Sequence, residues 1–419
     1  MRGASAKLSS YPERARESGT PNLPYGRQLI EDDDIEAVVA ALKGDFLTTG
    51  PTVSRFESTL ASIVGTREAV ACSSGTSALY MAARALNLKR GDTVIVPAIT
   101  FVATASAPHL AGAEIVFSDV DPETGLMRPC DLEAALARMP DGKAAAVFPV
   151  HFAGQSCDVA AIAKLARVRG LKVVEDAAHA LGTAWQGDKD ALVPIGACET
   201  SDLTIFSFHP VKTIAVGEGG AVTGNDPDLM RQVKLARNHG ITREVSEFTR
   251  TDAALSTSGA TNPWYYELTA PGFNFRISDI NCALGLSQLK KLPRFVAKRQ
   301  QLAKCYDALL APLSDAIRPL KRDPRSATSW HIYVVRIDFG ELKRDRGDLM
   351  RALSAEGIGT QVHYIPVHRQ PYYTQRYGAM MLPGAESYYA STLTLPLHAG
   401  MTESDVARVV AALKRHLGI

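Results

Sequence analysis

The chain has 419 residues, enough for two or three domains or for one large α/β unit with an appendage. Its 46 Lys and Arg residues nearly balance its 44 Asp and Glu residues, so the net charge is +2. This balance weighs against a nucleic-acid protein built on a broad basic face and against a disordered polyelectrolyte. The 46% hydrophobic content supports a sizeable buried core.

The six cysteines form no CxxC pair, which is typical of reduced, mostly buried thiols in a cytoplasmic protein. No apolar run reaches the roughly 18 residues that a membrane-spanning helix needs. Residues 1–24 lack a hydrophobic signal-peptide stretch, and we expect them to form a flexible N-terminal extension. The alternative is a mitochondrial presequence, against which Glu13 and Glu17 weigh.

Two helices are predicted near the start of the chain. The first follows Asp32 and ends near Gly44, and its apolar residues recur at helical spacing on one face: Ile35, Val38, Val39 and Leu42. The second begins near Thr76 and turns its apolar residues inward: Leu79, Ala82, Ala83 and Leu86.

Short apolar runs then alternate with helical or loop segments, such as the helix expected at 157–169. Most of these runs are rich in Val, Ile and Phe, as in strands covered by helices on both faces of a sheet. They predict a mostly parallel α/β sheet within a large domain, residues 25–284. The runs span 93–97, 114–120, 144–150, 172–175, 203–208 and 220–223.

A long helical tract is predicted over 278–310, where Pro293 should kink or break the helix. The remaining elements predict a smaller α+β domain over residues 285–419. They are strands at 331–337 and 359–364 and helices at 346–356 and 403–417.

Lys212 is the first candidate for chemistry. It lies on a turn between two predicted buried strands, near glycines at 217, 219 and 220 that let backbone approach closely. Desolvation at such a turn lowers the pKa of an amine, as imine formation requires. The alternative is an ordinary solvated loop lysine.

Asp176 is the second candidate, at the end of a Val-rich strand, with His179 three residues later. Ligands bind at the carboxyl ends of strands in α/β sheets. A carboxylate there can hold a protonated ring nitrogen, as pyridoxal phosphate requires. The alternative is that Asp176 caps the next helix.

A phosphate cradle and a stacking ring complete this set. Small residues at 73–77 precede a predicted helix, whose free N–H groups suit a phosphate, and Ser207 can add a hydroxyl. Phe101 and Thr104 follow a strand end, where a ring can stack on a flat cofactor. The alternatives are a common Ser-rich helix cap and a core aromatic. Together, the candidates are what a pyridoxal phosphate enzyme needs.

Several motifs in order resemble the DegT/DnrJ/EryC1/StrS family of pyridoxal phosphate-dependent sugar aminotransferases, which have the fold type I architecture of aspartate aminotransferase. The resemblance covers nearly the whole chain, from residue 24 to the terminal helix. Its most specific strings are SSGTSAL (73–79), TFVATA (100–105), EDAAHALG (175–182), FSFHPVK (206–212), GEGGA (217–221) and GFNFRISDINCALGLSQL (272–289).

The resemblance implies a role for each matching residue. Lys212 would form the imine and move protons, Asp176 would hold the ring nitrogen, and His179 would lie beside the ring hydroxyl. Asn274 would reach the phosphate of a neighbouring subunit, which implies a homodimer with shared active sites. The other cofactor-binding positions are Gly75, Thr76, Phe101, Thr104 and Ser207. A branch of the family that carries His in place of the lysine dehydrates sugars, so Lys212 favours transamination.

Three segments, at 24–28, 47–51 and 362–373, are most similar to the C4 aminotransferases of pseudaminic acid synthesis. This implies amino transfer from glutamate to C4 of a UDP-linked 4-keto-6-deoxy-N-acetylhexosamine. A GDP-perosamine synthase, another sugar aminotransferase of the family, and a non-catalytic regulator that binds the cofactor are the alternatives. The candidate sugar contacts are Tyr25, Arg27, His363, Tyr364 and Arg369. No metal is expected, since the spacing of His363 and His368 fixes no ligand pair on a helix face.

Overall fold

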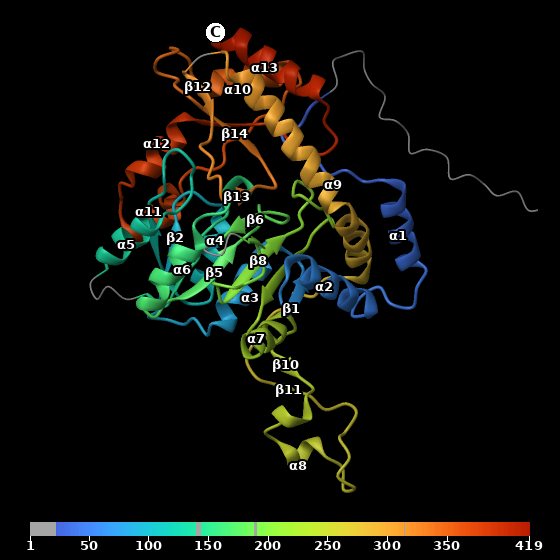
Figure 1. Ribbon diagram of the computed structural model, residues 1–419. Coiled ribbons are helices and arrows are strands. Elements are labelled where there is room, and N and C mark those ends of the chain that lie inside the picture. Colours follow the sequence, from blue (N-terminus) through green and yellow to red (C-terminus); the bar gives the residue numbers. More distant parts are fainter. Residues whose placement is uncertain (1–21, 140–143, 188–190, 314) are drawn as a thin grey trace, which may run out of the picture.

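The computed structural model describes residues 22–139, 144–187, 191–313 and 315–419 (Figure 1). Its centre is a seven-stranded sheet in the order β1-β9-β8-β5-β4-β2-β3. In this sheet β9 runs antiparallel to both neighbours, and the other pairs are parallel, which confirms the mostly parallel α/β prediction. The strands are β1 (Glu68–Cys72), β2 (Thr93–Pro97), β3 (Glu114–Ser118), β4 (Ala146–Val147), β5 (Lys172–Asp176), β8 (Leu203–Ser207) and β9 (Gly220–Gly224).

Both faces of this sheet are buried, which explains why its strands read as continuous apolar runs. In β1, Val70 and Cys72 belong to one hydrophobic cluster, while Ala69 and Ala71 belong to another. The helices that flank the sheet are α3 (Gly75–Ala85), α4 (Val102–Leu110), α5 (Pro129–Ala137), α6 (Val159–Val168) and α7 (Pro227–Arg237). Of the four predicted inner residues, Leu79, Ala82 and Ala83 are buried on α3 as expected, whereas Leu86 is the C-cap and is only partly buried.

Helix α1 (Asp32–Leu42) lies where it was predicted, but the face that it buries is the polar one. Asp34 is fully buried, whereas Leu42 is 54% exposed and Ile35 is 43% exposed. The reason is the neighbouring helix α9 (Asp279–Leu310), which meets α1 with the polar side chains of Gln288 and Lys291. Helix α2 (Pro51–Val64) follows and also packs against α9.

Helix α9 is continuous over 32 residues and passes through Pro293, so the expected break does not occur. Packing on both sides of the proline holds the helix together. Leu292 and Phe295 are buried in the cluster beneath the sheet, while Leu302 and Tyr306 are buried in the C-terminal cluster. Tertiary burial therefore outweighs the local cost of the proline.

The C-terminal region has its own antiparallel sheet, β12-β14-β15, and its own hydrophobic cluster. The predictions at 331–337, 346–356 and 403–417 are confirmed by β14, α10 and α13. The strand predicted at 359–364 is wrong, because Gln361 makes an isolated bridge to Thr394 and the segment turns into a cavity. The elements are β12 (Ile317–Pro319), β14 (Tyr333–Ile337), α10 (Arg346–Ala355), α11 (Pro371–Tyr377), α12 (Pro383–Ser391), β15 (Thr392–Leu395) and α13 (Glu403–Leu417).

An arm projects from the main body below α7 (Figure 1). It contains the short antiparallel pair β10 (Ile241–Thr242) and β11 (Glu267–Leu268) and the helical turn α8 (Thr251–Ala254). Its large apolar side chains are exposed, with Trp264 at 72% and Leu268 at 60%. A second small sheet, β13-β6-β7, joins β13 (Ser326–Ala327), β6 (Ala184–Gln186) and β7 (Leu192–Pro194).

The expected N-terminal extension lies mostly outside the described residues, since the described part begins at residue 22. Leu23 is buried and its N–H donates to the carbonyl of Gly357. The predicted domain boundary at 284/285 falls inside α9, which carries buried side chains from both regions. Across the described ranges, no helix is both long and apolar enough to cross a membrane.

Candidate active site

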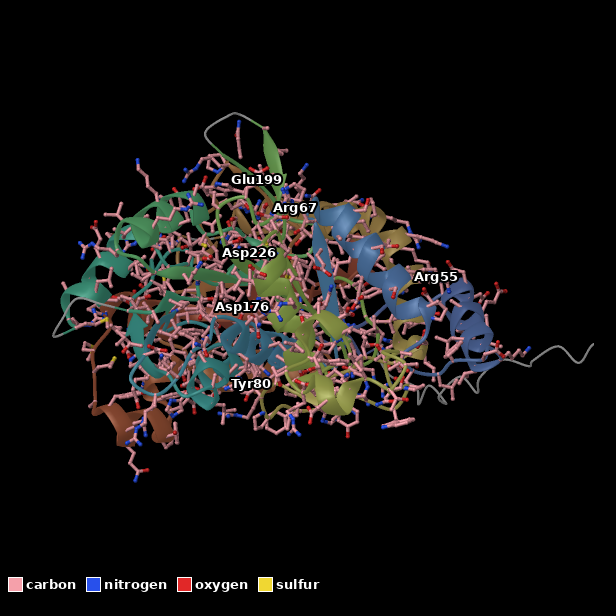
Figure 2. All side chains as sticks on the ribbon, turned by 90° about the horizontal axis from the view of Figure 1, so that it is seen from below. Arg55, Arg67, Tyr80, Asp176, Glu199 and Asp226 are labelled. Atoms are coloured by element: carbon pink, nitrogen blue, oxygen red, sulfur yellow. The ribbon has the colours of Figure 1, made fainter. Side chains whose placement is uncertain are left out.

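A cavity of about 520 Å³ opens at the carboxyl ends of β5 and β8. Because these strands are parallel, their last residues, Asp176 and Ser207, reach the same edge of the sheet. The N-terminal ends of α3 and α4 face the same cavity, and the segment 361–365 closes it from the C-terminal region. Figure 2 shows Asp176 within the body of the molecule, well away from Arg55 on α2.

Lys212 lines this cavity from the turn between β8 and β9. The turn is held by a hydrogen bond from the Lys212 N–H to the carbonyl of His209, 2.8 Å long. Burial lowers the pKa of the Lys212 amine to about 8, against the opposing effect of the Asp176 carboxylate. Such an amine is uncharged in a useful fraction of molecules near neutral pH and can act as a nucleophile or a base.

Asp176 is buried at the end of β5, with both carboxylate oxygens engaged. Its Oδ2 accepts a 2.6 Å hydrogen bond from the Thr104 hydroxyl, and its Oδ1 accepts one of 3.0 Å from the N–H of Ala178. Burial raises the pKa of Asp176, while Thr104, Ala178 and Lys212 lower it. The hydrogen bond to Ala178 is a local turn bond, and residues 177–183 form no helix, so the alternative of helix capping is wrong.

The start of α3 and the end of β8 form a cradle in which Gly75 has no room for a side chain. A Cβ at Gly75 would meet the Ser207 Cβ at 2.8 Å, and one at Gly220 would meet the Ser74 carbonyl oxygen at 2.4 Å. Ser74, which caps α3 through the N–H of Ser77, and Thr76 line the same corner of the cavity. Free N–H groups and small hydroxyls at a helix start suit a phosphate ester.

Histidine and tyrosine side chains form another part of the cavity wall. His179 Nε2 lies 3.1 Å from the Tyr364 hydroxyl, and its buried Nδ1 has no hydrogen-bond partner among the described residues. His363 lines the cavity beside Tyr25, with ring centroids 5.4 Å apart. Burial lowers the pKa of His363 to about 3, so its imidazole is neutral.

Phe101, the N-cap residue of α4, lines the cavity and is 56% exposed, so it is not a core aromatic. Its ring lies 6.0 Å from that of Tyr364. Together with Thr104 and Tyr25, it completes the predicted residues that the fold brings to one cavity.

Three predicted residues lie elsewhere. Arg369 does not line the cavity, because its guanidinium donates to Glu386 at 3.1 Å and lies over the ring of Tyr389. Arg27 is also absent from the cavity wall. Asn274 is exposed at the base of the arm, where its side chain accepts a hydrogen bond from the N–H of Arg276.

Sequence reasoning missed several cavity residues, of which His331 is the clearest. Its ring lies 4.3 Å from that of His179, and its buried Nδ1 has no partner within the described chain. His331 lies just before β14 with no motif around it, so only the tertiary arrangement reveals it. Gln361 and Gln370 also line the cavity. Because residues 359–364 were expected to form a strand, Gln361 was not predicted to line the cavity.

The residues present fit pyridoxal phosphate. The cradle that a side chain at Gly75 would fill suits the phosphate, and the buried Asp176 carboxylate suits a protonated ring nitrogen. Lys212 supplies an amine of lowered pKa in the same cavity, and the unpartnered Nδ1 of His179 is free for a polar ligand atom. These groups define a site for a phosphorylated aromatic aldehyde.

A family model gives the class: residues 28–414 match the DegT/DnrJ/EryC1/StrS aminotransferase family, and the chain belongs to this family. It is therefore a pyridoxal phosphate-dependent aminotransferase acting on sugars, which confirms the predicted fold, cofactor and enzyme class. This class does not fit the alternative of a non-catalytic regulator. The spore coat polysaccharide biosynthesis protein SpsC of Bacillus subtilis is 37% identical over 395 residues, 94% of this chain and 96% of that protein.

Solved structures of sugar aminotransferases are similar to this chain as well. The chain is similar to Helicobacter pylori PseC, an aminotransferase involved in the biosynthesis of pseudaminic acid, with a TM-score of 0.84 and 28% identity over 95% of this chain and 100% of that one. It is also similar to the PLP form of the Streptococcus pneumoniae sugar aminotransferase Spr1654, with a TM-score of 0.81 and 27% identity over 95% and 99% of the two chains.

Proposed function

We propose that this aminotransferase moves an amino group from glutamate to C4 of a nucleotide-linked 4-keto-6-deoxy sugar. The particular substrate that we propose is the UDP-linked 4-keto-6-deoxy-N-acetyl-altrosamine precursor of pseudaminic acid. The observation that carries this assignment is the similarity to PseC, which covers 95% of this chain and 100% of that one.

Within this proposal, each residue of the cavity has a chemical task. Bound pyridoxal phosphate supplies an electron-accepting ring on which the amino group is carried between donor and acceptor. The Lys212 amine, with its lowered pKa, attaches the cofactor and moves protons to and from the reacting carbons. Asp176 holds the proton of the ring nitrogen, and the cradle around Gly75, Thr76 and Ser207 binds the phosphate.

We propose Tyr25, His363 and Tyr364 as sugar contacts, because all three line the cavity and none of them belongs to the cradle. Neutral His363 can accept or donate a hydrogen bond without attracting the diphosphate. Arg27 and Arg369 are left out of this set because of their positions outside the cavity wall.

The working unit that we propose is a homodimer. Two exposed apolar surfaces support a second copy: the outward face of α1, with Val39 and Leu42, and the arm with Trp264 and Leu268. Exposed apolar surface of this kind marks association sites. Asn274, exposed at the base of the arm, is proposed to contact the phosphate of the partner's cofactor. The six free cysteines, four of them buried, support a cytoplasmic location.

A panel of nucleotide-linked 4-keto sugars tests the substrate. The enzyme is incubated with glutamate and each acceptor, and mass spectrometry detects the amino sugar. We expect the UDP-linked N-acetyl acceptor to react fastest. Preference for a GDP-linked acceptor would point to a perosamine synthase instead. Failure of glutamate to convert the bound cofactor to its amino form, seen by absorbance, would contradict the proposed donor.

A further inference from the structure

One histidine of the cavity wall is hydrogen-bonded to a residue outside that wall. The Nδ1 of His363 lies 2.9 Å from the hydroxyl of Thr394, and both side chains are buried. Thr394 belongs to β15 of the C-terminal sheet and does not line the cavity, whereas His363 does. The contact therefore joins the C-terminal sheet to the part of the wall assigned to the sugar.

The backbone around His363 is fixed independently of this contact. Gln361 and Thr394 exchange two backbone hydrogen bonds, of 3.2 and 2.8 Å. The hydroxyl of the fully buried Tyr388 donates to the carbonyl of His363 at 3.0 Å. None of these bonds uses the side chain of Thr394, so what the Thr394 hydroxyl fixes is the orientation of the His363 ring.

The orientation of the ring decides which of its nitrogens can meet a ligand. Because Thr394 engages Nδ1 of His363, Nε2 is the nitrogen that remains for a ligand. Burial lowers the pKa of His363 to about 3, so the ring is neutral and Nε2 either donates or accepts one hydrogen bond. A hydroxyl suits Nδ1 in both cases, since it can donate and accept. An aliphatic side chain at position 394 would leave Nδ1 buried and unpaired.

We propose that Thr394 is a positioning residue for the acceptor sugar, because it turns His363 so that Nε2 meets an oxygen atom of the sugar. The inference rests on the role of His363 as a sugar contact, which is part of the proposed function. The rings of Tyr25 and Tyr364 lie 5.4 and 4.8 Å from that of His363, measured between centroids. The three proposed sugar contacts thus form one group, and Thr394 orients one of its members.

The test separates the two halves of transamination, each followed by the absorbance of the bound cofactor. Glutamate converts the cofactor to its amino form without any sugar, and the UDP-linked 4-keto acceptor then reverses this change. Thr394→Val replaces the hydroxyl by a methyl group and keeps the backbone bonds of β15. The KM for the acceptor should rise about tenfold, while the reaction with glutamate stays as in the wild type. Thr394→Ser restores the hydroxyl and should restore the KM.

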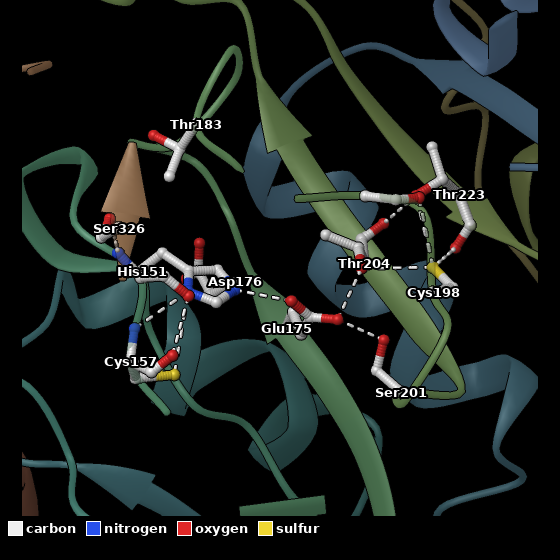
Figure 3. Close-up of polar contacts among 12 residues, drawn as sticks. His151, Cys157, Glu175, Asp176, Thr183, Cys198, Ser201, Thr204, Thr223 and Ser326 are labelled. Carbon is white, nitrogen blue, oxygen red and sulfur yellow. Dashed lines mark hydrogen bonds and ion pairs between the residues drawn. The ribbon is translucent and has the colours of Figure 1, made fainter. Parts of the chain in front are cut away.

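Thr223→Val is the matched control, because it also removes a buried hydroxyl from a strand. The Thr223 hydroxyl donates to the carbonyl of Gly196 at 2.9 Å, within the polar network with Thr204 and Cys198 that Figure 3 shows. Thr223 and Gly196 lie outside the cavity wall, so this variant should keep the wild-type KM for the acceptor. Thermal unfolding and the stoichiometry of bound cofactor verify that each variant is folded and loaded.

A double-mutant cycle assigns the effect to the ring of His363. His363→Ala should itself raise the KM for the acceptor, and adding Thr394→Val to it should cause no further change. An effect of Thr394→Val that persists without the ring would overturn the inference. The same holds if Thr394→Val leaves the KM for the acceptor unchanged or slows both half-reactions equally, because the hydroxyl is then merely structural.

Failure of the proposed function gives different results. If His363→Ala leaves the KM for the acceptor unchanged, the sugar contact itself is refuted and the inference falls with it. If the substrate panel favours another nucleotide sugar, that sugar takes the place of the UDP-linked acceptor in the same measurements. A wrong substrate assignment therefore leaves the comparison of the Thr394 variants intact.

Discussion

Two lysines of this protein, the buried Lys291 and the half-buried Lys212, have opposite tasks. Lys291 on α9 bonds directly to Asp33 at 2.5 Å and to Asp34 at 2.8 Å; burial opposes its charge, but these carboxylates raise its pKa. Lys212 lines the cavity with no hydrogen-bonding side chain among the described residues, and burial lowers its pKa to about 8. The difference teaches that direct carboxylate partners turn a buried lysine into a structural cation, whereas desolvation without them yields a reactive amine.

Replacing Lys212 is expected to have the largest effect. Lys212→Ala removes both the amine that attaches the cofactor and the group that moves protons, so kcat should fall by about 10³-fold or more. The imine absorbance band should also disappear. The exposed Lys164→Ala is the matched control and should keep both. Transamination at the wild-type rate in Lys212→Ala would contradict the assignment.

Replacing Lys291 tests the structural role of the second lysine. Lys291→Met leaves Asp34 buried without its cation, which should cost about 3 kcal/mol of the free energy of unfolding in denaturant titrations. The kinetic constants of the folded enzyme should change little, because α1 and α9 meet outside the cavity wall. A clear fall in kcat or rise in KM of the folded variant would show that the contact between α1 and α9 supports the active site.

The same variant has a pH signature. Burial opposes the charge on Asp34, but the bond to Lys291 lowers its pKa below the ordinary value. A lowered carboxyl pKa adds stability that is complete above the unfolded-state pKa of about 4 and is lost as the pH falls through the folded-state pKa. Lys291→Met should therefore lose less stability than the wild type between neutral pH and acid. Equal acid sensitivity would contradict this account.

Adding a side chain at Gly75 should weaken cofactor binding while both lysines remain in place. Gly75→Ala places a Cβ 2.8 Å from that of Ser207, and overpacking costs about 1–3 kcal/mol, so the Kd for pyridoxal phosphate should rise about tenfold or more. Gly44→Ala is the matched control, since its Cβ meets nothing nearer than 3.4 Å. Unchanged affinity in Gly75→Ala, measured by fluorescence titration, would place the phosphate elsewhere.

The smallest effect on the isolated fold is expected on the outward face of α1. Leu42 is 54% exposed, so Leu42→Ser should change the unfolding free energy of one chain by no more than about 0.5 kcal/mol. If this face meets a second copy, the variant should shift the dimer toward monomer in light scattering at low protein concentration. Lys43→Ser, at the adjacent exposed position, should not. An unshifted dimer would remove α1 from the proposed interface.

Much of the site could be predicted because its residues stand at the ends of regular elements. Asp176 ends the Val-rich strand β5, Thr76 lies in the first turn of α3, and Lys212 lies between the apolar strands β8 and β9. Those boundaries follow from local periodicity, and α/β sheets bring such ends together. The mostly parallel sheet could be predicted on the same ground.

The features that could not be predicted depend on which surfaces of the helices and strands pack together in the folded chain. The apolar face of α1 was visible in the sequence, but its outward orientation is set by Lys291, about 250 residues away along the chain. His331 enters the cavity only because β14 packs there, and the segment 359–364 leaves strand geometry to wall the cavity. Helix α9 continues through Pro293 because the burial of its side chains before and after the proline outweighs the helix-breaking tendency of proline.

The uninterrupted course of α9 has a consequence for how the chain melts. Its first half is buried with the central sheet and its second half with the C-terminal sheet, so neither region can lose its structure without exposing apolar side chains of the other. We therefore expect a single cooperative transition in calorimetry rather than two. A chain divided between Leu284 and Gly285 would leave the C-terminal fragment with a long helix whose first turns have no core to cover them.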